Sequence, residues 1–186
     1  LYRIDLVGGE ARKLLEHESS ISSYSFSPKG RKVAFRAVDP PSKEVKYRKK
    51  HGVDPIIYEE NLRYPRIWVA DLENGAKPRK LELPGAAMDV VWSPVDERLA
   101  VTLAPTPLVD DTYMQKRIHI VNSDSGSILT RIKNPGKLGD MAWSPDGKKL
   151  AFISGKTIND PMESCLFIAD PADSSGACKD MGPGLE

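Results

Sequence analysis

The feature that most limits how this chain can fold is a short turn motif that recurs along it. The clearest copy spans residues 144–147 and reads Ser-Pro-Asp-Gly, with Ser, Pro and Gly at the turn positions that each favours. Related turns begin at Ser27 and Ser93. Each turn lies between two short apolar runs, which predicts three β-hairpins. Because the serine belongs to a repeated unit, we interpret Ser144 as a turn residue and not as a nucleophile.

A second repeated unit is an apolar run that ends in Asp or Asn. The runs end at Asp5, Asp71, Asn122 and Asp170. The first three ends precede the three turn serines by the same distance, 22 residues. The distance from each turn to the next run varies instead, so insertions fall in only one half of the unit. The combined repeat predicts four antiparallel strands, which is typical of a β-propeller blade.

The repeat predicts an all-β chain that forms a partial β-propeller, with half a blade followed by three full blades. The expected boundaries are residues 1–16 for the blade fragment and 17–84, 85–133 and 134–183 for the blades. The third strands carry large, flat side chains that should pack between blades, namely Tyr2, Trp68, His119 and Phe167. His119 is therefore predicted to be structural. Blade faces exposed at the two ends are expected to favour self-association.

Composition limits the partners of this chain. Its 27 Lys and Arg residues are balanced by 26 Asp and Glu residues, whereas nucleic-acid-binding domains normally carry a basic excess. No apolar run approaches the roughly 18 residues that a membrane-spanning helix needs. No set of side chains has the spacing of a metal site, so neither a metal nor a cofactor is predicted. No secretory signal precedes the first expected strand.

Two cysteines, Cys165 and Cys178, flank the turn expected between the third and fourth strands of the last blade. Antiparallel pairing about the centre of that turn would place them opposite each other. A cross-strand disulfide is then expected if the protein is exported, and two half-buried thiols if it stays in a reducing compartment. The cysteines thus favour an exported or periplasmic location and leave a cytoplasmic one open.

Two stretches resemble known families. The Ser-Pro-Asp-Gly hairpin, followed by a strand that ends in Asp, resembles the TolB-like, WD-repeat-like β-propellers, although the Gly-His and Trp-Asp pairs of true WD repeats are absent. Residues 46–72, with a basic run, a Tyr-Glu-Glu stretch and an Ile-Trp-Val strand, resemble the propeller domain of prolyl oligopeptidase family serine peptidases. The similarity is to the dipeptidyl aminopeptidase and acylaminoacyl peptidase branch.

The peptidase resemblance implies that catalysis and the control of substrate access belong to two different domains. In that family a separate C-terminal α/β-hydrolase domain carries the catalytic Ser, Asp and His, while the propeller guards access, limits substrate size and contacts the peptide substrate. This sequence has no G-x-S-x-G motif, and Pro145 lacks the N–H that follows such a nucleophile. We therefore predict no catalytic residue in this chain. Glu59, Glu60 and Arg63 are candidates for contacts with a substrate, and a solvated charged loop is the alternative interpretation.

The connections between second and third strands are expected to leave one face of the propeller. They span residues 38–64, 104–116 and 154–163, and the first two are longer than plain connectors. A helix is expected only within residues 45–63, which Pro55 interrupts. We predict that this face makes the functional contacts. The leading hypothesis is a non-catalytic propeller portion of a serine peptidase, and the alternative is a TolB-like periplasmic module for protein–protein interaction without peptidase activity.

Overall fold

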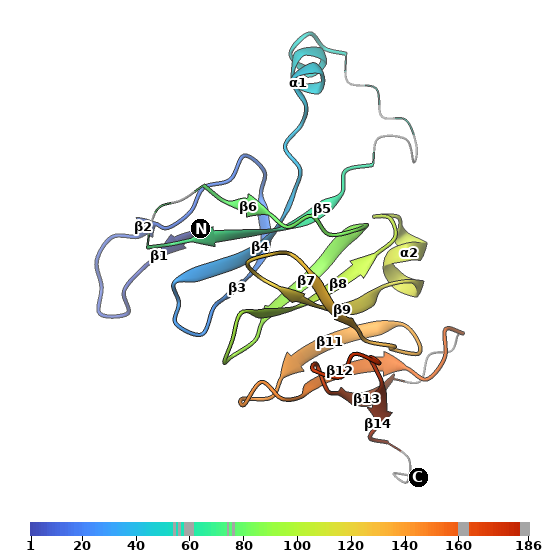
Figure 1. Cartoon of the computed structure of the whole chain (residues 1–186). Helices are drawn as coiled ribbons and strands as arrows, with labels where there is room; N and C mark the ends of the chain where they lie inside the picture. Colours follow the sequence, from blue (N-terminus) through green and yellow to red (C-terminus); the bar gives the residue numbers. More distant parts are fainter. Residues whose placement is uncertain are drawn as a thin grey trace.

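The computed structural model describes residues 1–53, 55, 57, 62–73, 75, 77–159 and 164–182. Within them, the strands form one two-stranded sheet and three four-stranded sheets, all antiparallel (Figure 1). The fold is thus the predicted all-β partial propeller of half a blade and three full blades.

Each full blade pairs its four strands in chain order. The half blade pairs β1 (Tyr2–Arg3) with β2 (Arg12–Lys13). Blade 1 consists of β3 (Ile21–Phe26), β4 (Lys32–Val38), β5 (Pro65–Asp71) and β6 (Arg79–Lys80). Blade 2 consists of β7 (Ala86–Trp92), β8 (Arg98–Ala104), β9 (Arg117–Asn122) and β10 (Ile128–Arg131). Blade 3 consists of β11 (Leu138–Trp143), β12 (Leu150–Gly155), β13 (Ser164–Ala169) and β14 (Cys178–Asp180).

The Ser-Pro turns join the first two strands of each blade, as expected. In blade 3 the Gly147 N–H donates to the Ser144 carbonyl oxygen at 2.9 Å, which closes the turn. The Ser144 hydroxyl donates to Asp146 Oδ1 at 2.6 Å and accepts from the Lys149 N–H at 2.9 Å. The Ser27 hydroxyl accepts from the Lys32 N–H in the same way, at 3.0 Å. Ser144 is therefore a turn residue.

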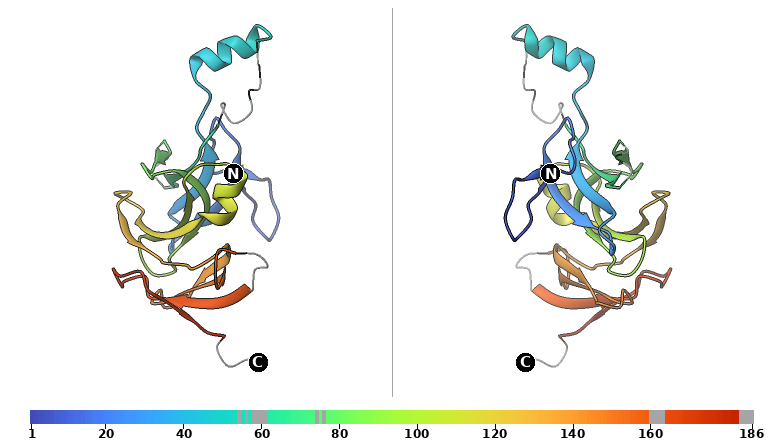
Figure 2. Two further views of the ribbon diagram at one scale, coloured as in Figure 1. Left: turned by 90° about the vertical axis from the view of Figure 1, so that its right-hand side faces the viewer. Right: turned by 90° about the vertical axis from the view of Figure 1, so that its left-hand side faces the viewer.

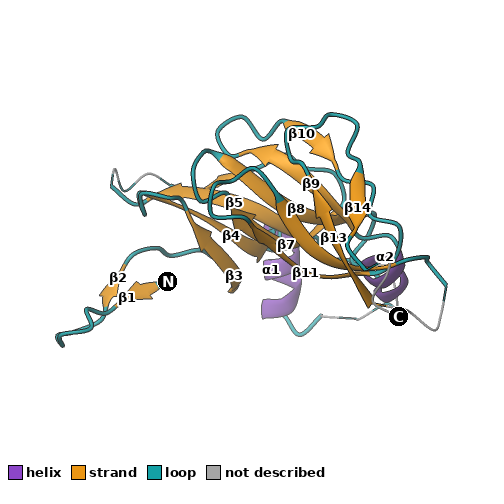
Figure 3. Ribbon diagram, turned by 90° about the horizontal axis from the view of Figure 1, so that it is seen from below, coloured by secondary structure: helices purple, strands orange, loops and turns teal. Residues whose placement is uncertain are grey.

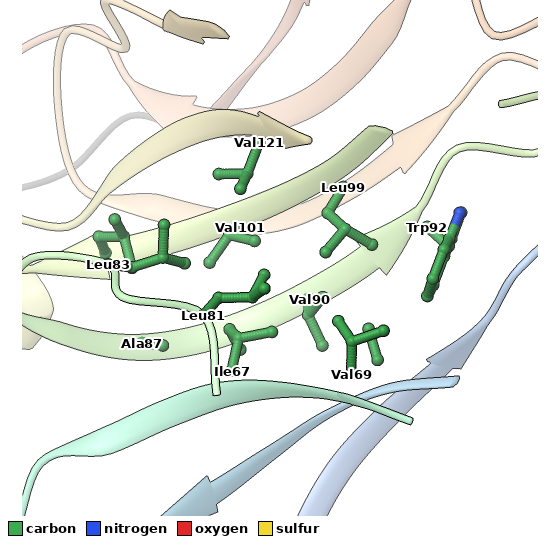
Figure 4. Packing of buried hydrophobic residues seen from close by; sticks show 12 residues of the cluster. Ile67, Val69, Leu81, Leu83, Ala87, Val90, Trp92, Leu99, Val101 and Val121 are labelled. Carbon is green, nitrogen blue, oxygen red and sulfur yellow. The ribbon is translucent and has the colours of Figure 1, made fainter. Parts of the chain in front are cut away.

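Apolar side chains between neighbouring blades form the core. One cluster fills the space between blades 1 and 2, where Ile67 and Val69 face Val90 and Trp92 (Figure 4). A second cluster joins blade 2 to blade 3, and a third joins the half blade to blade 1. Burial of one large aliphatic or aromatic side chain contributes about 1.5–3 kcal/mol. Each blade is therefore stabilised mainly by its neighbours.

Two of the large third-strand side chains, Phe167 and Trp68, pack into the clusters between blades as expected. Phe167 is buried and its ring stacks on Phe152, with the ring centroids 5.7 Å apart. Trp68 packs against the cluster between the half blade and blade 1, and His119 is half-buried. Tyr2 remains 65% exposed. That exception follows from its place in a sheet of only two strands.

The expected pairing of the two cysteines is wrong. β14 places Cys178 opposite Ala169, four residues along β13 from Cys165. That offset is about 13 Å along the strand, whereas a disulfide needs Cα atoms within roughly 7 Å. The reason is a longer connection with two successive turns, closed by Asp173 N to Asp170 O and Gly176 N to Asp173 O. Neither cysteine forms a disulfide and both are half-buried; the Cys178 thiol donates to the Lys133 carbonyl oxygen at 3.4 Å.

Two short helices lie in the connections between second and third strands. α1 (Lys43–Lys50) follows β4, and α2 (Val109–Met114) follows β8. The Ser42 hydroxyl caps α1 by accepting from the Val45 N–H at 3.2 Å, and Gly52 follows its end with φ 72°. α1 begins before the expected range and ends well before Pro55. Neither helix in the described part of the chain is long and apolar enough to span a membrane.

Candidate functional site

The candidate site is the face from which the connections between second and third strands emerge; we call it the loop face. The first strands β3, β7 and β11 are spatial neighbours, so equivalent ends of the three blades lie near one another. α2 of blade 2 borders a surface hollow of about 700 Å³ together with Ile158, from the corresponding connection of blade 3. Connections from two blades thus meet on one surface.

The hollow beside α2 combines apolar and charged groups. Val109 is 71% exposed and Tyr113 is 66% exposed, and Asp110 and Asp111 lie in the same helix. Lys137 lines the opposite side. Such a surface offers aromatic and aliphatic contacts next to charges of both signs, which suits a polypeptide better than a uniform polyanion.

A hydrogen-bonded loop fixes the start of α2. The Thr106 hydroxyl donates to Asp111 Oδ2 at 2.6 Å and accepts from the Leu108 N–H at 3.2 Å. The single side chain therefore satisfies a backbone donor and orients a carboxylate at the same time. Because no residue of α2 is buried, these bonds rather than packing hold the helix on the loop face.

α1 extends the loop face away from the blades (Figure 2). Its eight residues include five Lys or Arg and one Glu, and none of them is buried. Lys46 Nζ donates to Glu18 Oε2 at 2.8 Å, and this bond ties the helix to the segment before β3. α1 is thus a basic, solvent-facing arm.

The predicted substrate contacts divide into two groups. Glu59 and Glu60 lie outside the described residues. Arg63 is exposed, and its Nη2 donates to the Asp39 carbonyl oxygen at 3.1 Å, across the base of the first connection. The neighbouring Arg66 reaches Asp39 Oδ2 at 3.3 Å and donates to the Gly85 carbonyl oxygen at 2.6 Å.

Sequence reasoning missed this cluster of Arg66, Asp39 and Lys80, whose ammonium lies 3.5 Å from Asp39 Oδ1. Asp39 follows β4 and Arg66 is the second residue of β5, and the register that pairs Val38 with Pro65 brings them together. The length of the insertion hides that register in the sequence. The cluster holds the two ends of the first connection together at the edge of the sheet.

A second missed feature is a polar group on the first strand of blade 2. The β7–β8 register shifts between Ala87 and Asp89. At this bulge the Asp89 N–H donates to Thr102 Oγ1 at 2.9 Å, and the Thr102 hydroxyl donates to Asp89 Oδ2 at 3.2 Å. Lys116 Nζ, at the end of the second connection, lies 4.0 Å from Asp89 Oδ2. Through Asp89, the bulge thus links β7 to the end of the second connection, on the loop face.

The described residues contain no hydrogen-bonded serine–histidine–carboxylate set. His17 Nδ1 accepts from the Ser19 N–H at 3.1 Å, and the His51 and His119 Nδ1 atoms lie 2.8 and 3.1 Å from backbone carbonyl oxygens. The same part of the chain holds no group of three or more His, Cys, Asp or Glu side chains that could bind a metal. The loop face therefore offers surfaces for contact and hydrogen-bonding groups.

The comparisons with known proteins agree with this geometry at the level of the fold. The sequence matches no protein-family model and no curated protein. Among solved structures, TolB from Agrobacterium tumefaciens matches with 16% identity and a TM-score of 0.62, over 96% of this chain and 55% of its own. An oligogalacturonate lyase in complex with manganese matches with 16% identity and a TM-score of 0.65, over 97% and 46%.

A third match connects the fold to the peptidases. The acylaminoacyl peptidase of Pyrococcus horikoshii matches with 14% identity and a TM-score of 0.53, over 84% of this chain and 24% of its own. This chain therefore spans about half, or less, of the proteins it resembles. The chain has the fold of a partial β-propeller. More particularly, its blades are similar to those of TolB and of acylaminoacyl peptidase.

Proposed function

We propose that this chain is the non-catalytic β-propeller portion of a prolyl oligopeptidase family serine peptidase, which gates access to a hydrolase domain and helps to select its substrates. The observation that carries the proposal is the loop face, where connections from two blades meet around the hollow beside α2. The propeller similarity to an acylaminoacyl peptidase supports it. A surface of this kind can exclude large substrates and still present contacts to a short peptide.

The proposed substrate contacts lie on the first connection. Arg63 is exposed and donates one guanidinium N–H to the Asp39 carbonyl oxygen. A guanidinium has five N–H donors, so we propose that Arg63 also binds a carbonyl or carboxylate oxygen of the substrate. We propose that Glu59 and Glu60 pair with the ammonium group at the amino terminus of a peptide. The basic arm α1 would then stand beside the entry route.

The direct test uses the full-length peptidase that carries this propeller. Residues 40–62 are replaced by a short Gly-Ser linker, and hydrolysis of a small aminoacyl ester is compared with hydrolysis of longer peptides. We expect the small ester to be cleaved at an unchanged rate, while longer peptides are cleaved several-fold faster than by the wild type. A matched control shortens the β9–β10 turn, on the opposite end of the blades. Unchanged length preference after replacement of the first connection would contradict the gating role.

The alternative function is a TolB-like periplasmic module for protein–protein interaction, without a peptidase. The structural similarity to TolB over 96% of this chain supports it at the level of the fold. The two functions differ in what the gene encodes after Glu186. A G-x-S-x-G motif followed by Asp and His supports the peptidase, whereas further propeller repeats and then a stop codon support the interaction module.

A further inference from the structure

A different polar site lies at the outer rim, where blade 2 meets blade 3. Three cationic side chains border a surface hollow of about 500 Å³, namely Arg117 at the start of β9, Arg131 at the end of β10, and Lys133 just after β10. The turn at Ser174 and Ser175, between β13 and β14, forms the opposite wall. Seen from below, β10 and β14 lie toward the same edge of the blades (Figure 3), and the segment after β10 bonds to the turn before β14. We call this hollow the rim site.

Close backbone contacts fix the two walls of the rim site. The Lys133 N–H donates to the Gly176 carbonyl oxygen at 2.8 Å. Gly176 has φ 68°, and a Cβ atom there would lie 1.9 Å from the Arg131 carbonyl oxygen. Only glycine therefore permits this approach. Asn134, which is 3% exposed, also lines the hollow and donates from Nδ2 to the Gly136 carbonyl oxygen at 3.0 Å. The hollow is thus formed before any ligand arrives.

Within the described residues, no ion pair neutralises the positive charges at the rim. None of Arg117, Arg131 and Lys133 has a carboxylate within ion-pair distance in the described part of the chain. Arg117 Nη1 donates instead to the carbonyl oxygens of Met114 and Lys116, at 3.1 and 2.8 Å. Burial, and then the charge of Arg131, lower the pKa of Arg117. The like charges therefore repel one another.

The acidic group near these cations is already engaged. Hydrogen bonds from Ser175 lower the pKa of Asp173 most, and the nearby Lys133 ammonium lowers it slightly further. Those bonds run from the Ser175 N–H to Oδ1 at 2.8 Å and from the Ser175 hydroxyl to Oδ2 at 2.7 Å. Asp173 thus shapes the turn and leaves the Arg117–Arg131 side positively charged.

We propose that the rim site binds a phosphate group. The planar guanidinium groups of two arginines can each donate a pair of hydrogen bonds to phosphate oxygens, and an ammonium adds a third positive charge. The exposed Ser174 is placed to donate another hydrogen bond. A phosphate dianion matches three cations better than a single carboxylate does. The rim site and the hollow beside α2 have no lining residue in common.

The test measures binding of inorganic phosphate to the purified chain by titration calorimetry, against sodium chloride at equal ionic strength. Wild-type protein should bind phosphate saturably at one site. The Arg131→Gln/Lys133→Gln variant should lose at least about tenfold in affinity. The matched control is Arg12→Gln/Lys29→Gln, which removes the same charge from two exposed positions elsewhere. Its affinity should change less than about twofold, because long-range effects are screened by salt.

A second arm separates a soluble phosphate ligand from a lipid headgroup. Sedimentation with phosphatidylcholine vesicles is compared with and without phosphatidic acid, for the same three proteins. Binding of inorganic phosphate that the Arg131/Lys133 variant loses supports a soluble ligand, and variant-sensitive binding only to phosphatidic acid supports a headgroup. Absence of both, or equal losses in both double variants, would overturn the proposal.

A stability measurement checks that the Arg131→Gln/Lys133→Gln variant still folds. Arg131 and Lys133 are exposed, and removing them relieves repulsion at Arg117. Without phosphate, the Arg131→Gln/Lys133→Gln variant should therefore be at least as resistant to urea as the wild type. Saturating phosphate should raise the unfolding midpoint of the wild type alone. A phosphate-dependent rise of equal size in the variant would count against the rim site.

Discussion

Side chains next to the Ser-Pro turns connect blade 2 to blade 3 through single hydrogen bonds. Trp143 Nε1 donates to the Val91 carbonyl oxygen at 3.1 Å, from blade 3 to blade 2. The Arg98 guanidinium lies over the same ring, 5.3 Å from its centroid, and donates to the Gly147 carbonyl oxygen at 2.9 Å. Trp143, the aromatic residue before the third Ser-Pro turn, thus contributes a directional bond between blades as well as apolar area.

Replacement of Trp143 by Phe should reveal this bond. Trp68→Phe is the matched control, because the same atoms are removed from a ring whose buried Nε1 has no partner among the described residues. We expect Trp143→Phe to cost about 1 kcal/mol more than Trp68→Phe in the free energy of unfolding, since only the first loses a hydrogen bond. Urea unfolding measures the difference. Equal costs would show that the bond contributes nothing.

His119 should make stability depend on pH. Burial first, and then the positive charge of Arg131, lower its pKa in the folded protein, although a backbone bond to Arg117 opposes them. In the unfolded chain the His119 imidazole therefore takes up a proton near pH 6.5, whereas in the folded protein it does so only at a lower pH. Stability should fall as the pH drops from about 7 to 5.

The His119→Gln variant supplies the control for this pH dependence. It should lose less stability than the wild type over the same range, as measured by urea unfolding at each pH. Carboxylates contribute to both proteins alike, so the difference between them isolates the imidazole. A variant with the same slope as the wild type would contradict the assignment.

At the residue scale, the features that could be predicted from the sequence are those that depend only on residues close by in the chain. The turn role of Ser144 follows from neighbours within five positions, and the structure confirms it. The opposition of Cys165 and Cys178 failed because the second turn before Gly176 shifts the register. The rim cations were missed because β9 and β10 place Arg117 and Arg131 together only after folding.

At the scale of elements, close approach between blades depends on a few turns. The connection between β13 and β14 presses on the end of β10 through Gly176, which has φ 68° and no room for a Cβ atom. Gly30, in the first Ser-Pro turn, has φ 67° but open space around it. The two glycines share one backbone conformation and differ only in packing.

Alanine substitution at these two glycines should separate strain from packing. Gly30→Ala should cost about 1 kcal/mol, because an L-residue pays that much for a left-handed conformation. Gly176→Ala carries the same penalty and must also push the turn away from blade 2. We expect it to lose at least twice as much stability in urea unfolding. Similar losses for the two variants would mean that the blade 2–blade 3 contact is loose at the rim.

The strands were largely predictable from the sequence, and the helices were not. The 22-residue spacing predicts where each first and third strand lies. It is the length of chain from the end of the third strand of one blade to the turn that follows the first strand of the next blade. α2 has six residues and none is buried, so the sequence contains no apolar periodicity that would predict this helix. α1 was placed too far along the chain, since its start is set by the Ser42 cap and its end by Gly52.

At the scale of the whole molecule, blade 3 presents an outer face that no other described segment covers. Phe167 and Ala169 point toward blade 2, whereas Leu166 lies on the opposite side of β13 and is 44% exposed. Met181, beside Leu166 after β14, is 42% exposed. Apolar faces of this kind favour association.

We expect the chain to self-associate through this outer face. Sedimentation velocity should show a sedimentation coefficient that rises with concentration, and Leu166→Lys should suppress the rise because it places a charge on the face. Leu129→Lys, a similarly exposed position on β10, serves as the control and should leave association intact. A monomer at all concentrations would contradict the expectation.

The central claim is that this chain supplies a propeller surface and not the catalytic step. Reaction with a fluorophosphonate probe tests it most directly, because such probes label only activated serine nucleophiles. We predict no labelled serine in the purified chain by mass spectrometry, under conditions in which an active serine peptidase is fully labelled. Stoichiometric labelling of any serine in this chain, abolished by its replacement with Ala, would contradict the account.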